Sequence, residues 1–391
     1  MARSTRILTQ SKGEFTIVTT GMPQEAEASI TTTETDLEVV STELERWLTA
    51  KLDAATDVRV YNLSRPGHSG MSSVSVLFDL DWTEDGVATT AQLVARLAPE
   101  ATAFPVFPSY DLQAQFDVLT AVRQHSDVPV PRVRWVENSA EALGTPFLVM
   151  DRVTGAVPVD NPPYVFGGWL QESGVADRER VQSNSVDILA RIHGIDAELP
   201  FLNDKSGLRR HFEGERAYYE WTRRHDGLRI PVLESAFDWL EEHWPTEPSE
   251  DVLCWGDARI GNIMFEGTDP VAVLDWESAT LAPRELDLGW FIFFHRQFQD
   301  LAEQFSMPGL PDMFRRNDVV AEYENATGAS VRDLDFYLVY AALRHGIVMS
   351  QIERRRIHFG EKQPPENLDE YVMHHAMLAG LIDGTYEWEK K

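Results

Sequence analysis

Three oxygen-bearing side chains, Asp257, Asn262 and Asp275, stand at spacings that could assemble one reaction site. Asn262 comes directly before a short apolar run, and Gly267 and Pro270 then mark a turn. A β-rich run follows and ends just before Asp275, so the segment has the pattern of a β-hairpin. Antiparallel pairing would bring Asn262 and Asp275 side by side at the open end of the hairpin, and Asp257 would arrive from the loop before it.

Oxygen ligands of this kind suit magnesium, which proteins usually hold with one or two carboxylates and the phosphates of a substrate. A third oxygen-bearing group can orient an attacking hydroxyl. The pattern therefore predicts a phosphoryl-transfer site.

The composition is that of a globular enzyme. The chain has 391 residues, enough for two or three domains or for one large two-lobed unit. Its apolar runs fall short of the roughly 18 residues that span a bilayer, and its N-terminus lacks the apolar core of a signal peptide. We therefore expect a cytoplasmic protein that binds no membrane. The single cysteine, Cys254, excludes an intramolecular disulfide framework.

The charge balance excludes one class of partner. The chain has 63 acidic against 35 basic residues and a formal charge of -28. Nonspecific nucleic-acid binding needs a basic surface, so we expect none. Cationic substrates are compatible with this charge, and so is a simple role of the acidic residues in solubility. The sequence specifies no oligomeric state.

The elements that must position the site begin after a polar segment, residues 1–34, which we expect to be a flexible arm. Apolar residues at helical spacing follow over 37–52, and alternating residues predict strands at 58–63 and 74–80. The loop between these strands contains Gly67, Ser69 and Gly70. Such a loop lets backbone amides approach phosphate oxygens, although glycine and serine are equally typical of an ordinary turn.

Further along, a strand at 92–97 carries Arg96, and residues 112–122 have the spacing of a helix. Strands are expected at 133–137 and 147–153, and the proline-rich segment after them is a natural boundary. We therefore predict an N-terminal nucleotide-binding lobe over 35–153 and a mainly helical C-terminal lobe over 154–391. This organisation places the protein in the α+β class.

The segment Trp-Gly-Asp-Ala-Arg-Ile-Gly-Asn (255–262, the catalytic loop below) resembles that of the aminoglycoside phosphotransferase family, small-molecule relatives of protein kinases. Asn262 lies 5 residues after Asp257, as in the kinase catalytic loop, and Asp275 lies 13 residues later. The resemblance covers roughly residues 35–350. It implies a bilobal kinase-like fold with ATP, or GTP, and Mg²⁺ as cofactors and a small-molecule hydroxyl as acceptor.

The resemblance also assigns roles. Asp257 would accept or orient the proton of the substrate hydroxyl, and Asn262 and Asp275 would bind the metal. Arg259 would either stabilise charge on the transferred group or form a surface salt bridge. Glu277 is more consistent with pairing to a nearby arginine than with support of the metal site.

In the N-terminal lobe, Arg96 takes the place of the strand lysine that contacts nucleotide phosphates, and Gln115 replaces its usual glutamate partner. A neutral hydrogen bond would then replace the ion pair of protein kinases. Met150, Asp151 and Val153 correspond to the interlobe hinge, whose backbone groups bind a purine. Asp287 and His193 match structural positions of the family.

Several other classes lack their motifs. The sequence has no P-loop, no dinucleotide-binding glycine pattern, no nucleophile elbow and no zinc motif. The segments around 128–133 and 144–147 most resemble the branch related to kinase domains fused to acyl-CoA dehydrogenases. The acceptor stays open between aminoglycosides, other alcohols and hydroxyacyl thioesters. The alternative is a nucleotide-binding pseudokinase or regulatory protein without turnover.

Overall fold

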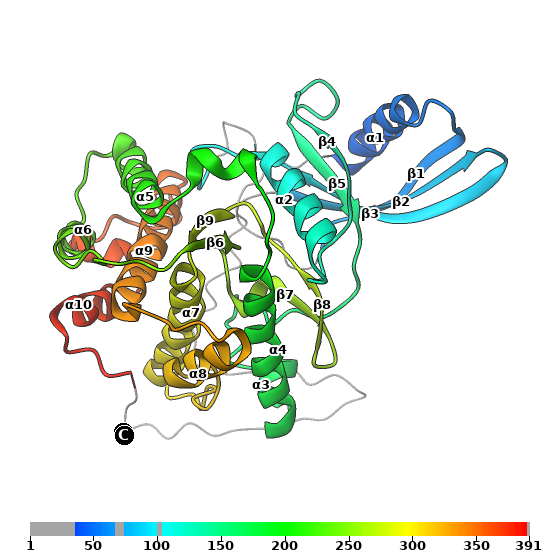
Figure 1. Cartoon of the computed structure of the whole chain (residues 1–391). Coiled ribbons are helices and arrows are strands. Elements are labelled where there is room, and N and C mark those ends of the chain that lie inside the picture. Colours follow the sequence, from blue (N-terminus) through cyan, green and yellow to red (C-terminus); the bar gives the residue numbers. More distant parts are fainter. Residues whose placement is uncertain (1–35, 67–73, 100–103, 389–391) are drawn as a thin grey trace, which may run out of the picture. The chain divides into compact units, whose positions relative to one another are not determined.

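The computed structural model describes residues 36–66, 74–99 and 104–388 (Figure 1). Two predictions lie outside the described residues: the N-terminal arm, and the phosphate-contacting loop residues Gly67, Ser69 and Gly70.

The first part of the described chain is an antiparallel sheet of five strands, in the order β1-β2-β3-β5-β4. Alternation in sequence becomes alternation between faces, because side chains of a strand point to opposite sides in turn. In β2, for example, Val76, Phe78 and Leu80 are all fully buried. The strands are β1 (Thr56–Ser64), β2 (Val74–Glu84), β3 (Val87–Leu97), β4 (Val133–Glu137) and β5 (Phe147–Asp151). Each of the strands predicted in this lobe is thereby confirmed.

One helix covers each face of this sheet. Helix α1 (Leu37–Lys51) buries Leu44 and Leu48 in one apolar cluster with Phe147 of β5. Helix α2 (Leu112–His125) belongs to a second cluster that contains Leu148, the next residue of the same strand. That second cluster continues into the helical lobe, so α2 links the sheet to the core of the helical lobe.

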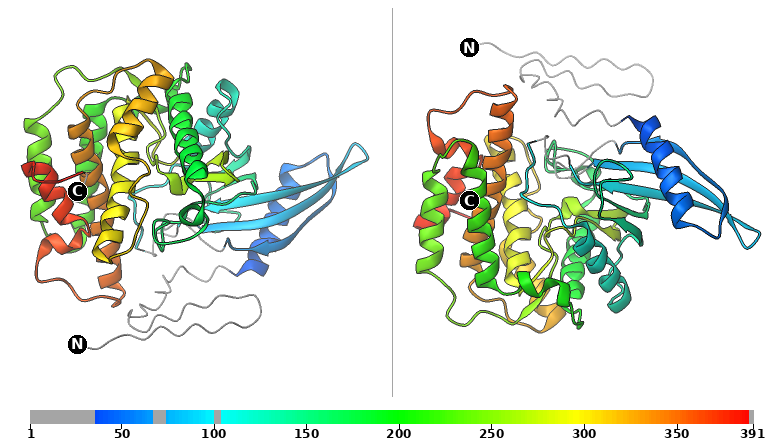
Figure 2. Two further views of the ribbon diagram at one scale, coloured as in Figure 1. Left: turned by 90° about the horizontal axis from the view of Figure 1, so that it is seen from below. Right: turned by 90° about the horizontal axis from the view of Figure 1, so that it is seen from above.

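The helical lobe is organised around α7 and α9, which pack side by side (Figure 2). Most residues of both helices are buried, which explains the long apolar runs at 288–294 and 336–343. The α-helices are α3 (Trp169–Glu172), α4 (Val175–His193), α5 (Leu208–Thr222), α6 (Pro231–Glu242), α7 (Glu285–Gln304), α8 (Arg316–Thr327), α9 (Leu334–His358) and α10 (His375–Asp383). Short 3-10 helices lie at Pro200–Lys205, Arg223–His225, Ile260–Asn262 and Leu368–Tyr371.

Two strand pairs interrupt the helices between α6 and α7. β6 (Asp251–Cys254) pairs with β9 (Thr280–Pro283), and β7 (Ile263–Glu266) pairs with β8 (Asp269–Val273). The second pair is the hairpin predicted from the turn residues. Among the described helices, none is both long enough and apolar enough to cross a bilayer.

We expect Leu48→Ala to lower the free energy of unfolding by about 2 to 5 kcal/mol, because the truncation leaves a cavity between α1 and the sheet. Leu48 is fully buried there. Val39→Ala is the matched control on the outer face of α1, where the side chain is 56% exposed. It should change stability by less than about 0.5 kcal/mol in the same urea unfolding experiment. Equal losses in both variants would contradict the packing described here.

Candidate active site

The β7–β8 hairpin places Asn262 and Asp275 at its open end, as predicted. Its register pairs Ile263 with Val273, and the amide of Leu274 donates to the carbonyl oxygen of Asn262 at 2.9 Å. One predicted metal ligand therefore enters the hairpin and the other leaves it. Asp275 has a φ of 56°, in the left-handed region that aspartate adopts more readily than most residues.

The carboxylate of Asp287, in the first turn of α7, fixes the backbone of the catalytic loop. It accepts hydrogen bonds from the amides of Trp255 at 2.6 Å and Gly256 at 2.9 Å, and His193 Nε2 lies 3.2 Å away. Gly256 has a φ of 89°, and a Cβ atom there would lie 2.0 Å from the carbonyl oxygen of Ser278. Only glycine fits this turn. The predicted structural role of Asp287 follows directly from these bonds.

The carboxylate of Asp257 collects three side-chain donors. Asn262 Nδ2 donates to Oδ2 at 2.7 Å, Trp290 Nε1 donates to Oδ1 at 2.8 Å, and Arg259 Nε lies 3.0 Å from Oδ1 and 3.1 Å from Oδ2. Burial, followed by the charge of Asp275, raises the pKa of Asp257 from 3.8 to about 7. A carboxylate that titrates near neutrality is suited to exchange a proton with a hydroxyl group.

Arg259 is ion-paired on two sides. Beyond Asp257, its guanidinium contacts Asp160. Asp160 packs closely on the loop, because a Cβ atom on Gly261 would lie 2.6 Å from its Oδ1. The Arg259 side chain is only 20% exposed, so it forms a largely buried pair rather than a surface salt bridge. Its action on the transferred phosphate stays a prediction.

Arg96 reaches from β3 to the open end of the hairpin. Its guanidinium pairs with Asp275, and Nη2 lies 3.0 Å from Glu277 Oε2. Glu277 thus pairs with an arginine, as favoured from the sequence. Burial alone would raise the pKa of Asp275, but the charges of Arg96 and then Arg259 outweigh it and hold that pKa below its ordinary value. Gln115, the predicted neutral partner of Arg96, is buried in α2.

The residues Asn262 and Asp275 fit a magnesium ion. Both carry the oxygen donors that Mg²⁺ prefers. The amide nitrogen of Asn262 donates to Asp257, which leaves the amide oxygen of Asn262 as its metal-binding atom. Asp275 is paired with Arg96 and its pKa is lowered, so its carboxylate carries the negative charge that a metal ligand needs.

One trio of potential metal ligands occurs elsewhere in the part of the chain that the structure describes: His193, Cys254 and Asp287. Both Asp287 oxygens accept hydrogen bonds from loop amides, and the Cys254 thiol donates to the carbonyl of Ala282 at 3.4 Å. Burial raises the pKa of this thiol, which disfavours the thiolate that a metal requires. The trio therefore has a structural role, in which Asp287 binds the loop.

The predicted purine-binding segment lies at the end of β5. Strand pairing ends with Asp151, and the amide of Arg152 still donates to the carbonyl oxygen of Gln92 at 2.9 Å. Val153 is the first residue beyond the ladder, where peptide groups can meet a ligand. Contact of Met150, Asp151 and Val153 with a nucleotide stays a prediction.

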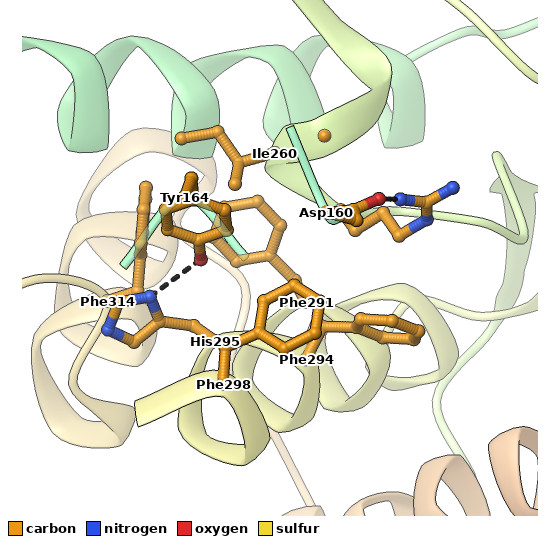
Figure 3. Close-up of a pocket in the computed structure, with 10 residues that line it drawn as sticks. Asp160, Tyr164, Ile260, Phe291, Phe294, His295, Phe298 and Phe314 are labelled. Carbon is orange, nitrogen blue, oxygen red and sulfur yellow. Dashed lines mark hydrogen bonds and ion pairs between the residues drawn. The ribbon is translucent and has the colours of Figure 1, made fainter. Parts of the chain in front are cut away.

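A small aromatic pocket lies beside the catalytic loop (Figure 3). With room for about 10 Å³, it holds no more than a single water molecule. Tyr164 and His295 are hydrogen-bonded across it at 2.7 Å, and the Asp160–Arg259 ion pair lies at its edge. The residues that line it are Asp160, Tyr164, Arg259, Ile260, Gly261, Phe291, Phe294, His295, Phe298 and Phe314. It is a packing feature of α7 and too small for an acceptor.

Sequence reasoning missed three residues of the site: Asp160, Trp290 and Arg344. Arg344 Nη2 donates to the carbonyl oxygen of Gly256 at 3.0 Å. Trp290 had a usable signal, because it stands three residues after Asp287 and so lies on the same face of a helix. Asp160 and Arg344 had none, since each lies far along the chain from the loop that it contacts.

Comparison with models of protein families identifies one family that matches this chain. A model described as the phosphotransferase enzyme family matches residues 80–317, which is well over half of the chain. The matched stretch contains every predicted site residue that the structure describes.

Curated relatives confirm the predicted branch. Acyl-CoA dehydrogenase family member 10 of Mus musculus is 26% identical over 281 residues, covering 68% of this chain and 25% of that protein. Acyl-CoA dehydrogenase family member 11 of Gallus gallus is 27% identical over 226 residues, covering 54% of this chain and 27% of that protein. The chain thus spans about a quarter of the length of these relatives.

Solved structures confirm the kinase-like fold. A Ralstonia eutropha protein grouped with the aminoglycoside phosphotransferases has a TM-score of 0.60 and 22% identity, covering 88% of this chain and 97% of that one. A thermostable variant of aminoglycoside phosphotransferase APH(4)-Ia, solved with ADP and hygromycin B, has a TM-score of 0.52 and 15% identity, covering 88% and 99%. At these identities the likeness establishes the fold, and the predicted α+β bilobal class is correct.

We expect Asp287→Asn to lower the free energy of unfolding by about 3 kcal/mol, because one buried loop amide would then face an amide N–H group. Asp312→Asn is the control, since that carboxylate is 86% exposed. It should stay within about 0.5 kcal/mol of the parent chain in urea unfolding. A stable Asp287→Asn variant would show that the loop amides do not depend on this carboxylate.

Acid should destabilise the protein partly through His295. Burial lowers the pKa of this imidazole from 6.5 to about 4, so between these values the unfolded chain holds a proton that the folded chain lacks. Stability therefore falls as pH is lowered from about 6.5 to about 4. His295→Gln cannot take up this proton, so we expect its deficit in unfolding free energy at pH 7.5 to shrink at pH 5. A deficit that is the same at both pH values would refute this assignment.

Proposed function

The chain belongs to the phosphotransferase enzyme family, and from this premise we propose that it moves the γ-phosphate of ATP to a hydroxyl group of a small molecule. GTP is the alternative donor, and Mg²⁺ is the proposed metal cofactor. The observation that carries the proposal is the convergence of Asp257, Asn262 and Asp275 at one end of a hairpin, with Arg96 joining them from the other lobe.

In this mechanism the protein supplies position and charge. Asp257 takes the acceptor hydroxyl proton, and its three donors hold the carboxylate in one orientation while it does so. Arg259 lies against the same carboxylate, where its charge can stabilise the transferred group. Asn262 and Asp275 would hold the Mg²⁺, which would neutralise charge on the nucleotide phosphates when bound.

The remaining proposed contacts orient the nucleotide. Arg96 can bind a phosphate with two parallel hydrogen bonds, as arginine does with carboxylates. The backbone at Met150, Asp151 and Val153 would meet the purine. Gly67, Ser69 and Gly70 are proposed to approach the phosphates from the loop between β1 and β2.

The acceptor is proposed to be a small molecule. APH(4)-Ia is described with hygromycin B, whereas the curated relatives carry the acyl-CoA dehydrogenase name. A useful acceptor panel therefore contains aminoglycosides, simple alcohols and hydroxyacyl thioesters, each tested with ATP and with GTP.

We expect Asp257→Asn to lower the turnover rate about 10²- to 10⁴-fold, because the acceptor proton loses its base. The affinity for Mg-ATP should stay within about threefold, since Asp257 is not a proposed nucleotide ligand. ADP formation on the acceptor panel and a thermal-shift titration with Mg-ATP measure the two effects.

Asp238→Asn is the control for this experiment, because it removes one carboxylate from the exposed face of α6 and should leave turnover unchanged. An unaffected rate in Asp257→Asn would sink the proposed role of Asp257. Binding of Mg-ATP without turnover on the whole panel would instead favour a pseudokinase or regulatory protein.

A further inference from the structure

The indole of Trp290 is a donor to the proposed base that comes from α7, outside the catalytic loop. Its Nε1 lies 2.8 Å from Asp257 Oδ1, and the side chain is only 6% exposed. On the other oxygen, Asn262 Nδ2 lies 2.7 Å from Oδ2. The two carboxylate oxygens are thus held by different groups.

This arrangement restricts rotation of the carboxylate. The terminal torsion of aspartate is soft, and Arg259 Nε, at 3.0 Å and 3.1 Å from the two oxygens, does not distinguish one from the other. A partial rotation of the carboxylate moves one oxygen away from the indole and the other away from Asn262, and only a half-turn, which exchanges two equivalent oxygens, restores both bonds. Hydrogen bonds to a charged group are the stronger ones, so this restriction is substantial.

The indole is itself held in place. The guanidinium of Arg344 lies 4.3 Å from the centre of the Trp290 ring, and its Nη2 donates to the carbonyl oxygen of Gly256 at 3.0 Å. Phe294 packs on the same ring with centroids 4.9 Å apart. Trp290 also stands one helical turn after Asp287, so the start of α7 fixes both the backbone of the loop and the side chain of its base.

We propose that Trp290 is a positioning residue, which orients the Asp257 carboxylate toward the attacking hydroxyl through its indole N–H. This inference rests on the phosphotransferase function proposed above and deepens it. A misplaced base lowers the rate of the chemical step more than it weakens substrate binding.

Two variants separate the hydrogen bond from packing. Trp290→Phe keeps an aromatic ring but removes the N–H group. Trp290→His keeps a ring N–H, because imidazole Nε2 occupies the place of indole Nε1, but it loses the volume of the second ring. If Trp290 positions the base, Trp290→His should be more active than Trp290→Phe. If Trp290 only fills space, Trp290→Phe should be the more active variant.

Transfer of phosphate from Mg-ATP to water, followed as phosphate release, gives a rate for every variant without an identified acceptor. We expect Trp290→Phe to lower kcat about 10- to 100-fold and to leave the KM for ATP within about twofold. Trp290→His should retain more kcat than Trp290→Phe while its Tm falls further, because it leaves a cavity.

Trp47→Phe is the matched control. Its indole donates to Glu137 Oε2 at 2.9 Å in the sheet lobe, so the change removes the same type of bond away from the site and should leave kcat unchanged.

A double variant supplies a second test. In Asp257→Asn, the further change Trp290→Phe should lower the residual rate less than twofold, because both residues act through one carboxylate.

A parental kcat in Trp290→Phe would overturn the inference. So would losses of kcat that follow losses of Tm, or a full additional loss in the Asp257→Asn background. Absence of phosphate transfer by the unchanged chain, both to water and to every acceptor of the panel, would overturn the proposed function and the inference with it.

Discussion

The gathering of carboxylates at one buried corner of an acidic chain is the constraint on which this structure depends. Asp257, Asp275 and Glu277 are each no more than about a quarter exposed, and charges removed from water must be paired. The cations come from separate elements: Arg96 from β3 and Arg259 from the catalytic loop. Because Arg96 belongs to the sheet lobe, its pairing with Asp275 and Glu277 brings the two lobes together at this point.

The site also depends on a catalytic loop with one fixed conformation. The start of α7 fixes that conformation. Asp287 lies in the first helical turn, where a negative charge is favoured by the helix dipole, and it binds two loop amides. Trp290 follows one turn later and binds the proposed base. Arg344 joins both features, since it contacts the loop carbonyl of Gly256 and the face of the indole. The packed helices α7 and α9 therefore fix both the backbone of the loop and the side chain of its proposed base.

These two conditions explain what sequence reasoning could and could not find. The hairpin was predictable, because its turn residues and β-rich runs are local, and the offset between Asp257 and Asn262 is local too. Asp160 and Arg344 were not predictable, because their partners are chosen by tertiary packing and no spacing records it. Arg96 is intermediate. Its strand and its role as a cation were predictable, but its carboxylate partners depend on how the lobes meet.

The same charge balance bears on how an acidic chain could accept a nucleotide. Arg96 pairs with the carboxylates of Asp275 and Glu277 in this structure. In the proposed function it would pair with the nucleotide phosphates, which are also negatively charged. An exchange of carboxylate for phosphate costs the guanidinium little, since both offer paired acceptor oxygens. The cost falls on Asp275 and Glu277, which would lose their ion pairs with Arg96. A divalent cation held by Asp275 and the amide oxygen of Asn262 would offset that loss, so the arrangement favours joint arrival of nucleotide and metal over binding of the nucleotide alone.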